Sequence, residues 1–251
     1  MKSTRFDHVV LVVGLLLLWQ VLHWVVGPNV LSTPGSTIAR AFELMQTRSF
    51  WVHAASTATA FGLASLISIL AGIVLGLWLG LRRFAGEVAD PILNTLYSIP
   101  KITLYPLILL IFGLGISAKI AFGVLHGIFP IAIFTMNAVR NVSPIYRRTA
   151  RMMQLSSVAT ATTIMAPAAL PELLTGVRIG VALTLLGTLI GELFASTAGI
   201  GFALIRAMEV HAVTDILAIT TLLFVFAVSV NAILHFIEQW FRHDGRRPRS
   251  H

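Results

Sequence analysis

The chain has 251 residues, of which 57% are hydrophobic and only 11% are charged, and it contains no cysteine. Soluble domains carry about 25% charged residues, so this composition leaves too few polar side chains to coat a water-soluble globule. The chain is also far too apolar to be disordered. The absence of cysteine excludes thiol catalysis, cysteine zinc sites and disulfides. The composition indicates a polytopic membrane protein, in which a net charge of +8 reflects topology and not nucleic-acid binding.

Apolar runs long enough to cross a bilayer recur along the whole chain. A hydrocarbon core of about 30 Å needs about 20 helical residues. We predict six transmembrane helices, at about residues 9–27, 53–81, 90–112, 117–139, 177–195 and 216–240. The first run follows Lys2 and Arg5 but is too long for a cleaved signal peptide, so we expect a retained signal anchor. The six helices predict an all-α fold with a single transmembrane domain over residues 1–251.

The distribution of basic residues sets the expected orientation. Residues 152–170 carry no charge and could be taken for a seventh span, but they are rich in Ala, Ser and Thr and contain Pro167. With six spans, thirteen Lys and Arg residues lie on the side of the N-terminus and four on the other side. Because basic residues concentrate in cytoplasmic loops, we expect both termini in the cytoplasm.

The connection at about residues 140–176 is then cytoplasmic and is the longest in the chain. Long connections in compact proteins are usually functional or disordered. This one contains helix-favouring Ala and Met and few glycines, so we expect short helices at the membrane surface, ended by Pro167 and Pro171. It is either a docking surface for a cytoplasmic partner or a simple amphipathic tether.

Small residues recur every four positions along the second predicted helix. Such a ridge lets two helix backbones approach closely in a membrane, where the hydrophobic effect cannot drive association. The pattern favours packing against another helix of the same chain and a tightly packed bundle over a wide pore. The ridge consists of Ser56, Ala60, Ala64, Ser68, Gly72, Gly76 and Gly80.

The third predicted helix is interrupted by Pro100 and Pro106 and carries Lys101. Backbone groups freed by proline in a membrane need protein or water partners, and a lysine there is costly unless it faces the interior or snorkels. The segment either lines a substrate pathway or holds Lys101 in a structural role. The candidate pathway residues in this segment are Tyr97, Pro100, Lys101 and Thr103.

The fifth predicted helix adds Thr184, Thr188 and Glu192 to the candidate pathway, because they share one four-residue repeat with Gly180. A glutamate within a membrane is a candidate functional residue. Glu192 could pair with Lys101, line an outer gate or lie at the membrane interface. The histidines show no ligand spacing, and no nucleotide-binding loop is present, so we expect no metal, no cofactor and no ATPase site in this chain.

Several motifs together resemble the bacterial ATP-binding-cassette importer permeases, most closely the nitrate, sulfonate and taurine branch, which also handles some vitamin precursors. The resemblance covers about residues 30–240. It implies the type I permease fold. The motifs that carry it are Asp90-Pro91-Ile92, Ile99-Pro100, Pro106-Leu107, Phe112-Gly113-Leu114-Gly115, Ser117-Ala118-Lys119-Ile120, Phe129-Pro130, Pro167-Ala168-Ala169-Leu170-Pro171 and Leu174-Thr175-Gly176-Val177-Arg178-Ile179-Gly180.

The resemblance also implies the partners. It implies a homodimer in the bacterial inner membrane, a separate ATPase dimer that uses ATP and Mg²⁺, and a periplasmic or lipid-anchored solute-binding protein. The family's Glu-Ala-Ala…Gly motif falls on Arg148, Thr149, Ala150 and Gln154, of which only Ala150 conforms. The coupling helix is expected at about 153–163. The residues expected to contact the ATPase are Met153, Gln154, Leu155, Ser156, Ser157, Val158 and Ala159.

The function expected from this resemblance is import of a small solute by alternating access. An ion-coupled secondary transporter is the alternative, and it would need charged coupling sites and usually inverted repeats. Only Lys101 and Glu192 qualify as such sites, and no repeat is visible. An intramembrane enzyme would need paired catalytic groups, and none is recognisable.

Overall fold

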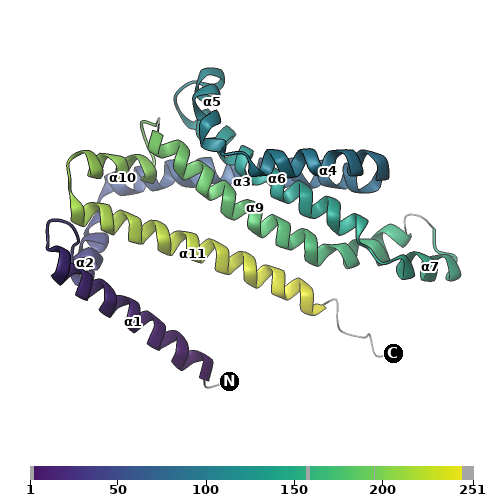
Figure 1. Cartoon of the computed structure of the whole chain (residues 1–251), viewed down its shortest axis with the longest axis horizontal. Helices are drawn as coiled ribbons and strands as arrows, with labels where there is room; N and C mark the ends of the chain where they lie inside the picture. Colours follow the sequence, from purple (N-terminus) through teal and green to yellow (C-terminus); the bar gives the residue numbers. More distant parts are fainter. Residues whose placement is uncertain (1–2, 157–158, 195, 245–251) are drawn as a thin grey trace.

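The computed structural model describes residues 3–156, 159–194 and 196–244, and these are almost entirely helical. The helices form one elongated bundle with short connections (Figure 1). The predicted all-α fold is confirmed. In chain order the elements are α1 (Ser3–Val26), α2 (Pro34–Met45), α3 (Arg48–Leu81), α4 (Arg83–Ser98), η1 (Lys101–Leu104), α5 (Tyr105–Phe112), α6 (Ile116–Arg140), α7 (Pro144–Met152), η2 (Thr160–Met165), α9 (Ala166–Phe194), α10 (Ile200–Glu209) and α11 (Val213–Asp244).

Helix α6 forms the centre of the bundle and packs along both α3 and α9. The side chains that α3 buries include a series of small ones at four-residue intervals. Small side chains at this spacing bring two helix axes close together over several turns. The predicted ridge of small residues is therefore confirmed as a contact between helices of the same chain. Its buried members are Ala60, Ala64, Ser68, Gly72 and Gly76.

Two glycines show how closely these backbones approach. A Cβ atom added to Gly76 of α3 would lie 2.5 Å from the carbonyl oxygen of Ala132 on α6. One added to Gly127 of α6 would overlap Thr184 Oγ1 on α9. By contrast, a Cβ atom on Gly62, also on α3, would meet nothing within 4 Å. The central contacts thus require glycine, whereas the outer face of α3 does not.

Four of the described helices, α3, α6, α9 and α11, are long and apolar enough to span a membrane. The pair formed by α4 with η1 and α5 passes the same test together, but it is bent by 85° at the break between its halves. Helix α1 adds a shorter apolar stretch, Val10–Val26. The six predicted spans correspond, among the described residues, to these four long helices, the one bent pair and the one shorter helix.

The interruption predicted in the third helix is confirmed, because residues 90–112 are divided between α4 and α5. Ile99 adopts an extended backbone, and Pro100 has no N–H to continue the ladder of hydrogen bonds, so α4 ends at Ser98. A single 3₁₀ turn follows, and α5 begins with Pro106 in its first turn, where no N–H is needed. The two prolines thus account for both sides of the bend.

Helix α9 begins at Ala166, before the predicted start of the fifth span at residue 177, so the expectation that Pro167 and Pro171 end short helices is wrong. Pro167 lies in the first turn, which tolerates proline, and Pro171 removes only a hydrogen bond back to that turn. The helix therefore runs through both prolines, and only the first part of the predicted connection 140–176 lies outside α9.

Helix α11 is attached to α9 by a buried polar contact near one end of the bundle. Arg178 Nε of α9 lies 3.0 Å from Glu238 Oε2 of α11, and Thr175 Oγ1 donates a hydrogen bond of 2.8 Å to Glu238 Oε1. Glu238 is almost fully buried. A buried carboxylate needs such partners, so this contact fixes α11 against the core.

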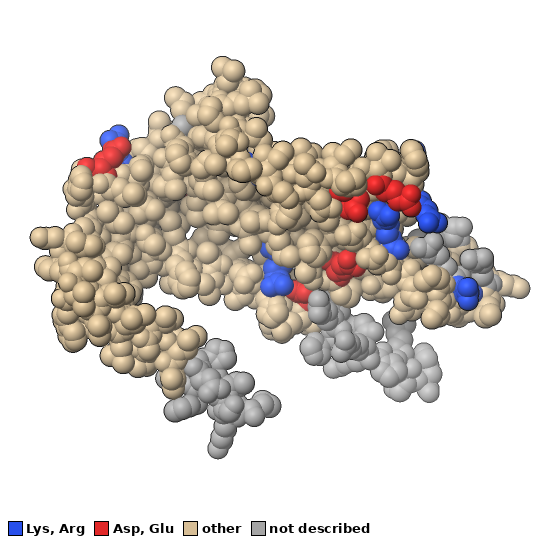
Figure 2. Space-filling view, viewed as in Figure 1, with Lys and Arg blue, Asp and Glu red and all other residues tan. Residues whose placement is uncertain are grey.

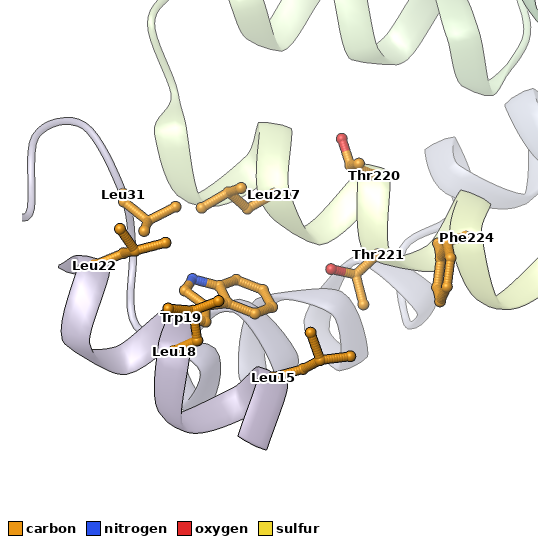
Figure 3. A pocket seen from close by; sticks show the side chains of 9 residues that line it. All are labelled: Leu15, Leu18, Trp19, Leu22, Leu31, Leu217, Thr220, Thr221 and Phe224. Carbon is orange, nitrogen blue, oxygen red and sulfur yellow. The ribbon is translucent and has the colours of Figure 1, made fainter. Parts of the chain in front are cut away.

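Helix α1 lies beside α11 and apart from the rest of the bundle (Figure 1). Trp19 Nε1 donates a hydrogen bond of 3.0 Å to the carbonyl oxygen of Ser32, which secures the end of α1. A groove of about 460 Å³ separates α1 from α11. Trp19 of α1 and Phe224 of α11 both line it, together with leucines of α1 (Figure 3). The groove is lined almost entirely by apolar surface.

The two ends of the bundle differ in charge. Helices α2 and α10 lie at one end, where Arg40 Nε bonds Asp215 Oδ1 at 2.5 Å, and α7 lies at the other end (Figure 1). On the face shown in Figure 2, acidic and basic side chains gather mainly at the end that carries α7, with a smaller group near α10. The stretch between these two groups is nearly uncharged on this face. This pattern is typical of a protein whose middle crosses a membrane.

Candidate functional site

The threonines predicted to line a pathway on α9 lie inside the helix packing. Thr184 and Thr188 are fully buried. Thr184 Oγ1 donates to the carbonyl oxygen of Gly180 at 2.8 Å, and Thr188 Oγ1 donates to that of Thr184 at 2.9 Å. Both hydroxyl groups therefore return to their own helix, as is common for threonine in apolar helices, and they contact the glycine surface of α6.

Glu192, one turn further along α9, forms the centre of a buried polar cluster. Its Oε1 lies 3.4 Å from Lys119 Nζ of α6. Thr57 Oγ1 of α3 donates to the carboxylate at 2.8 Å, and the backbone N–H of Gly201 donates to Oε2 at 2.9 Å. Glu192 is fully buried and Lys119 almost so. Three spans and the first turn of α10 thus meet at one carboxylate.

The same cluster also holds the turn that leads into α10. The N–H of Ile200 donates to Thr57 Oγ1 at 2.8 Å, and Lys119 Nζ donates to the carbonyl oxygen of Ala198 and to Ser56 Oγ. Gly199 has a φ of 123°, and a Cβ atom there would overlap the carboxylate of Glu192. A side-chain carboxylate at a helix N-terminus satisfies N–H groups that have no partner within the helix. The cluster therefore clamps α10 onto the core.

The partner of Glu192 is Lys119, and no contact joins Glu192 to Lys101 among the described residues. The sequence places Lys119 with the basic residues of the outer side, at the start of the predicted span 117–139, and indicates no role for it beside Glu192. The helix register carried the missing signal, because Lys119 lies in the first turn of α6 and Glu192 near the end of α9. Neighbouring antiparallel helices bring the start of one level with the end of the other, so the two charges lie at the same depth.

Lys101 lies at the bend between α4 and α5 and has different partners. Its Nζ donates to the carbonyl oxygen of Tyr97 at 2.7 Å, and it lies 5.1 Å from the ring centre of Tyr97 and 5.8 Å from that of Phe129. Thr103 Oγ1 donates to the carbonyl oxygen of Pro100 at 2.8 Å. The break in the helix is thus stabilised by the side chains that follow it, and by cation–π contacts.

The predicted pathway residues therefore form two separate groups. Tyr97, Pro100 and Thr103 are exposed at the bend, while the α9 group is buried between helices. Sequence reasoning did not assign a role to Tyr105, whose hydroxyl donates to the carbonyl oxygen of Gly191 at 2.6 Å. This bond connects α5 to α9 at the residue before Glu192, so Tyr105 links the bend to the polar cluster.

The connection proposed for partner docking has a defined turn. Helix α7 ends at Met152, and Gln154 has a left-handed backbone with φ 50°. The N–H of Leu155 donates to the carbonyl oxygen of Ala150 at 3.0 Å, the bond expected when a helix ends in a left-handed residue. Glycine is the usual residue there, and the family motif aligned above places its glycine at Gln154. Gln154 thus has the left-handed backbone that glycine adopts most readily, at the position where the motif has its glycine.

The prediction of one helix over residues 153–163 is wrong. Met153 and Gln154 form a turn, Leu155 and Ser156 are not helical, and a π-helical turn occupies Thr160–Met165. The left-handed residue ends the first helix, which is why a single helix cannot form. Of the predicted contact residues, Ser157 and Val158 lie outside the described residues, and Ala159 is helical and half-buried.

Comparison with known proteins identifies the family. Residues 68–244 match the family described as binding-protein-dependent transport system inner membrane component. The chain belongs to this family. It is 28% identical over 248 residues to the taurine transport system permease protein TauC of Escherichia coli strain K12, covering 93% of this chain and 90% of that protein. It is also 28% identical to the putative aliphatic sulfonates transport permease protein SsuC of Bacillus subtilis strain 168, over 76% of this chain and 70% of that protein.

A solved structure supports the same fold. The inward-facing MetNI methionine ABC transporter matches with a TM-score of 0.60 at 18% identity, covering 77% of this chain and 94% of the matched chain. The helices of this permease therefore have the type I importer fold. The resemblance inferred from the motifs is confirmed, and the protein is a multi-pass component of an inner membrane transport system.

Proposed function

We propose that this permease is the transmembrane subunit of an ATP-driven importer that moves a small solute of the taurine, sulfonate, nitrate or vitamin-precursor type into the cytoplasm by alternating access. The family match over residues 68–244 carries the proposal. The names of the two relatives support a substrate with an anionic group, and so does the cation of Lys101, which is buried beside the exposed residues of the bend.

Uptake into vesicles tests this proposal directly. Vesicles that contain the permease with its co-purifying ATPase should accumulate taurine or an alkane sulfonate only when ATP is enclosed in the lumen with the ATPase and the binding protein is added outside. An ionophore that collapses ion gradients should leave this uptake unchanged. Uptake that needs an ion gradient and no ATPase would support the ion-coupled alternative.

We propose that the turn after α7 is the contact with a separate ATPase, at the positions predicted from the sequence. Met152 and Met153 expose most of their surface there, and Leu155 is half-buried behind them. Exposed methionines form adaptable apolar contacts. Leu155→Asp should prevent both ATPase co-purification and substrate-stimulated ATP hydrolysis. Val30→Asp, an exposed residue between α1 and α2 at the other end, should leave co-purification unchanged.

We propose that the permease works as a homodimer. One chain presents one turn of this kind, whereas an ATPase dimer has two docking positions. The bend leaves Tyr97, Pro100 and Thr103 at the surface of a single chain, so a second copy against this face would enclose them in a pathway between two chains. The chain has no cysteine, which makes single-cysteine crosslinking unambiguous.

Crosslinking at the bend tests the dimer. Ile102→Cys, at an exposed position of η1, should give a crosslinked dimer in membranes. Phe236→Cys is the control, because this exposed residue belongs to α11, on the opposite side of the bundle from the bend (Figure 1). Monomers at both positions, or a pairing with a different permease, would overturn the homodimer.

We further propose that both termini and the turn after α7 face the cytoplasm, and that α2 and α10 face the periplasm, where a solute-binding protein would deliver the substrate. The arginine-rich end and the positive-inside rule support this orientation. Arg206→Cys should react with a membrane-impermeant thiol reagent in intact spheroplasts, whereas Arg148→Cys should react only after the membrane is opened. The reverse pattern would overturn the orientation.

A further inference from the structure

A polar pocket of about 380 Å³ lies where the ends of α3 and α6 meet the start of α4. It differs from the groove between α1 and α11, which is lined mainly by leucine and aromatic side chains. The pocket is also distant from the Glu192 cluster, because the cluster lies toward the start of α3 and of α6 and the pocket at their last turns. The lining residues are Gly80, Leu81, Arg83, Glu87, Arg140 and Asn141.

The charges around this pocket are not balanced. Arg83 Nε lies 3.0 Å from Glu87 Oε1, so that carboxylate is already engaged. Arg140 is half-buried, and no ion pair joins it to a carboxylate among the described residues. Its Nη1 lies 3.4 Å from the position that a Cβ atom on Gly86 would take, so its side chain lies along the first turns of α4. The pocket therefore holds two arginines against one glutamate.

The start of α4 adds positive potential to the same place. This helix has 16 residues, and no side chain caps its N-terminus. The first N–H groups of a helix have no partner within it and attract anions. They reinforce the excess charge that Arg140 already brings into the pocket.

The surface beside the pocket is strongly apolar. Leu81, Phe84 and Trp78 are 72%, 81% and 50% exposed, and they belong to the last turns of α3 and the first turn of α4. The guanidinium of Arg82 lies 5.5 Å from the ring centre of Trp78. Tryptophan and outward-reaching arginine are typical of the headgroup level of a membrane. The pocket thus opens at the level of the headgroups, next to a surface suited to acyl chains.

We propose that this pocket binds the phosphate headgroup of an anionic phospholipid, with its acyl chains along Leu81, Phe84 and Trp78. Basic pockets between spanning helices at a membrane surface are suited to such headgroups. The adjacent apolar surface favours a lipid over free phosphate, which would need only the charged half of the site. Arg140 is the principal contact, because it is the arginine of the pocket that no carboxylate in the described chain engages.

Native mass spectrometry of the full-length permease tests the proposal. The chain is released from detergent after incubation with phosphatidylglycerol or with phosphatidylcholine, and the lipid retained on it is counted. The wild type should retain phosphatidylglycerol in preference. Arg140→Gln should weaken this retention about fivefold, the effect of one arginine at a membrane surface. Arg140→Lys, which keeps the charge, should retain most of it.

Two further variants keep the test decisive if Arg140→Gln fails to fold. Glu87→Gln removes the competing carboxylate and releases Arg83, so it should increase retention of phosphatidylglycerol. Arg206→Gln changes an exposed arginine of α10 at the other end and should leave it unchanged. Equal retention of both lipids by the wild type, or displacement of lipid by inorganic phosphate alone, would overturn the proposal. The proposal would also be overturned if Arg140→Gln lost ATPase co-purification but retained lipid as the wild type does. The pocket would then be a contact with a protein.

Discussion

The polar cluster and the bend of the permease each contain one lysine, and different kinds of contact hold these two side chains. Lys119 lies between α3, α6 and α9 and pairs with the buried carboxylate of Glu192. Lys101 lies at the bend of α4 and α5 and bonds a backbone carbonyl and two aromatic rings. The first lysine depends on a charge of opposite sign, and the second does not. The burial of a lysine in a membrane protein therefore does not by itself show whether its role is only structural.

The largest effect is expected at the paired lysine. Lys119→Met leaves Glu192 buried without its cation, and breaking a buried pair in this way costs about 3–5 kcal/mol. Thermal unfolding of the purified chain in detergent should show a large loss of stability. The double variant Lys119→Met with Glu192→Gln should recover much of it, because no unpaired charge remains. If the single and double variants were equally unstable, packing and not charge would hold this cluster together.

A smaller loss is expected where helices meet through glycine. Gly76→Ala places a methyl group 2.5 Å from the carbonyl oxygen of Ala132, and overpacking of this kind costs about 1–3 kcal/mol. Gly62→Ala on the same helix meets nothing within 4 Å and gains the same helix propensity. The difference between the unfolding temperatures of the two variants isolates the cost of the close contact. Equal temperatures would mean that α3 moves away from α6 easily.

The lysine at the bend should affect transport more than stability. Lys101→Met removes no carboxylate partner, so its unfolding temperature should stay near that of the wild type, in contrast to Lys119→Met. The initial rate of taurine or sulfonate uptake should fall about tenfold, which corresponds to ~1.4 kcal/mol in the barrier, the size of one charge-assisted contact. Unchanged uptake, with a cysteine at residue 101 that stays unreactive to water-soluble reagents, would make Lys101 structural.

The smallest effect is expected at the partly exposed pair outside the spans. Arg40 and Asp215 keep side-chain exposures of 39% and 29%, and such pairs contribute about 0–1 kcal/mol. The hydrogen bond to Asp215 raises the pKa of Arg40. A raised pKa means that this contribution is fully present below the ordinary pKa of arginine and is lost only above it. Arg40→Gln should therefore have the same small effect at about pH 7 and about pH 9, and high salt should reduce it.

The sequence predicted the contents of the site better than its arrangement. The small-residue ridge of α3 and the interruption at Pro100 followed from residue spacing and from the missing N–H of proline. The cost of a carboxylate in lipid singled out Glu192, but its burial and its partner were left open. The grouping of Thr184 and Thr188 with Tyr97 and Thr103 as one pathway remains a prediction, and the structure shows the two groups in different surroundings, one buried and one exposed. Helix periodicity gives the face of one helix but not which helix covers it.

The sequence by itself determined that this is an all-helical membrane protein, where its apolar segments lie and which family it resembles. Those features depend on composition, local periodicity and proline, each of which acts within one segment. Only the tertiary structure decided that Lys119 is the partner of Glu192, that Gln154 takes the left-handed position of the motif glycine, and that Arg140 borders a pocket with Arg83. Each of these features depends on contacts between separate helices or between the two ends of one turn. The reason is that a buried charge or a left-handed backbone is stabilised by the groups beside it in space, and these are distant in the sequence or set by the local turn.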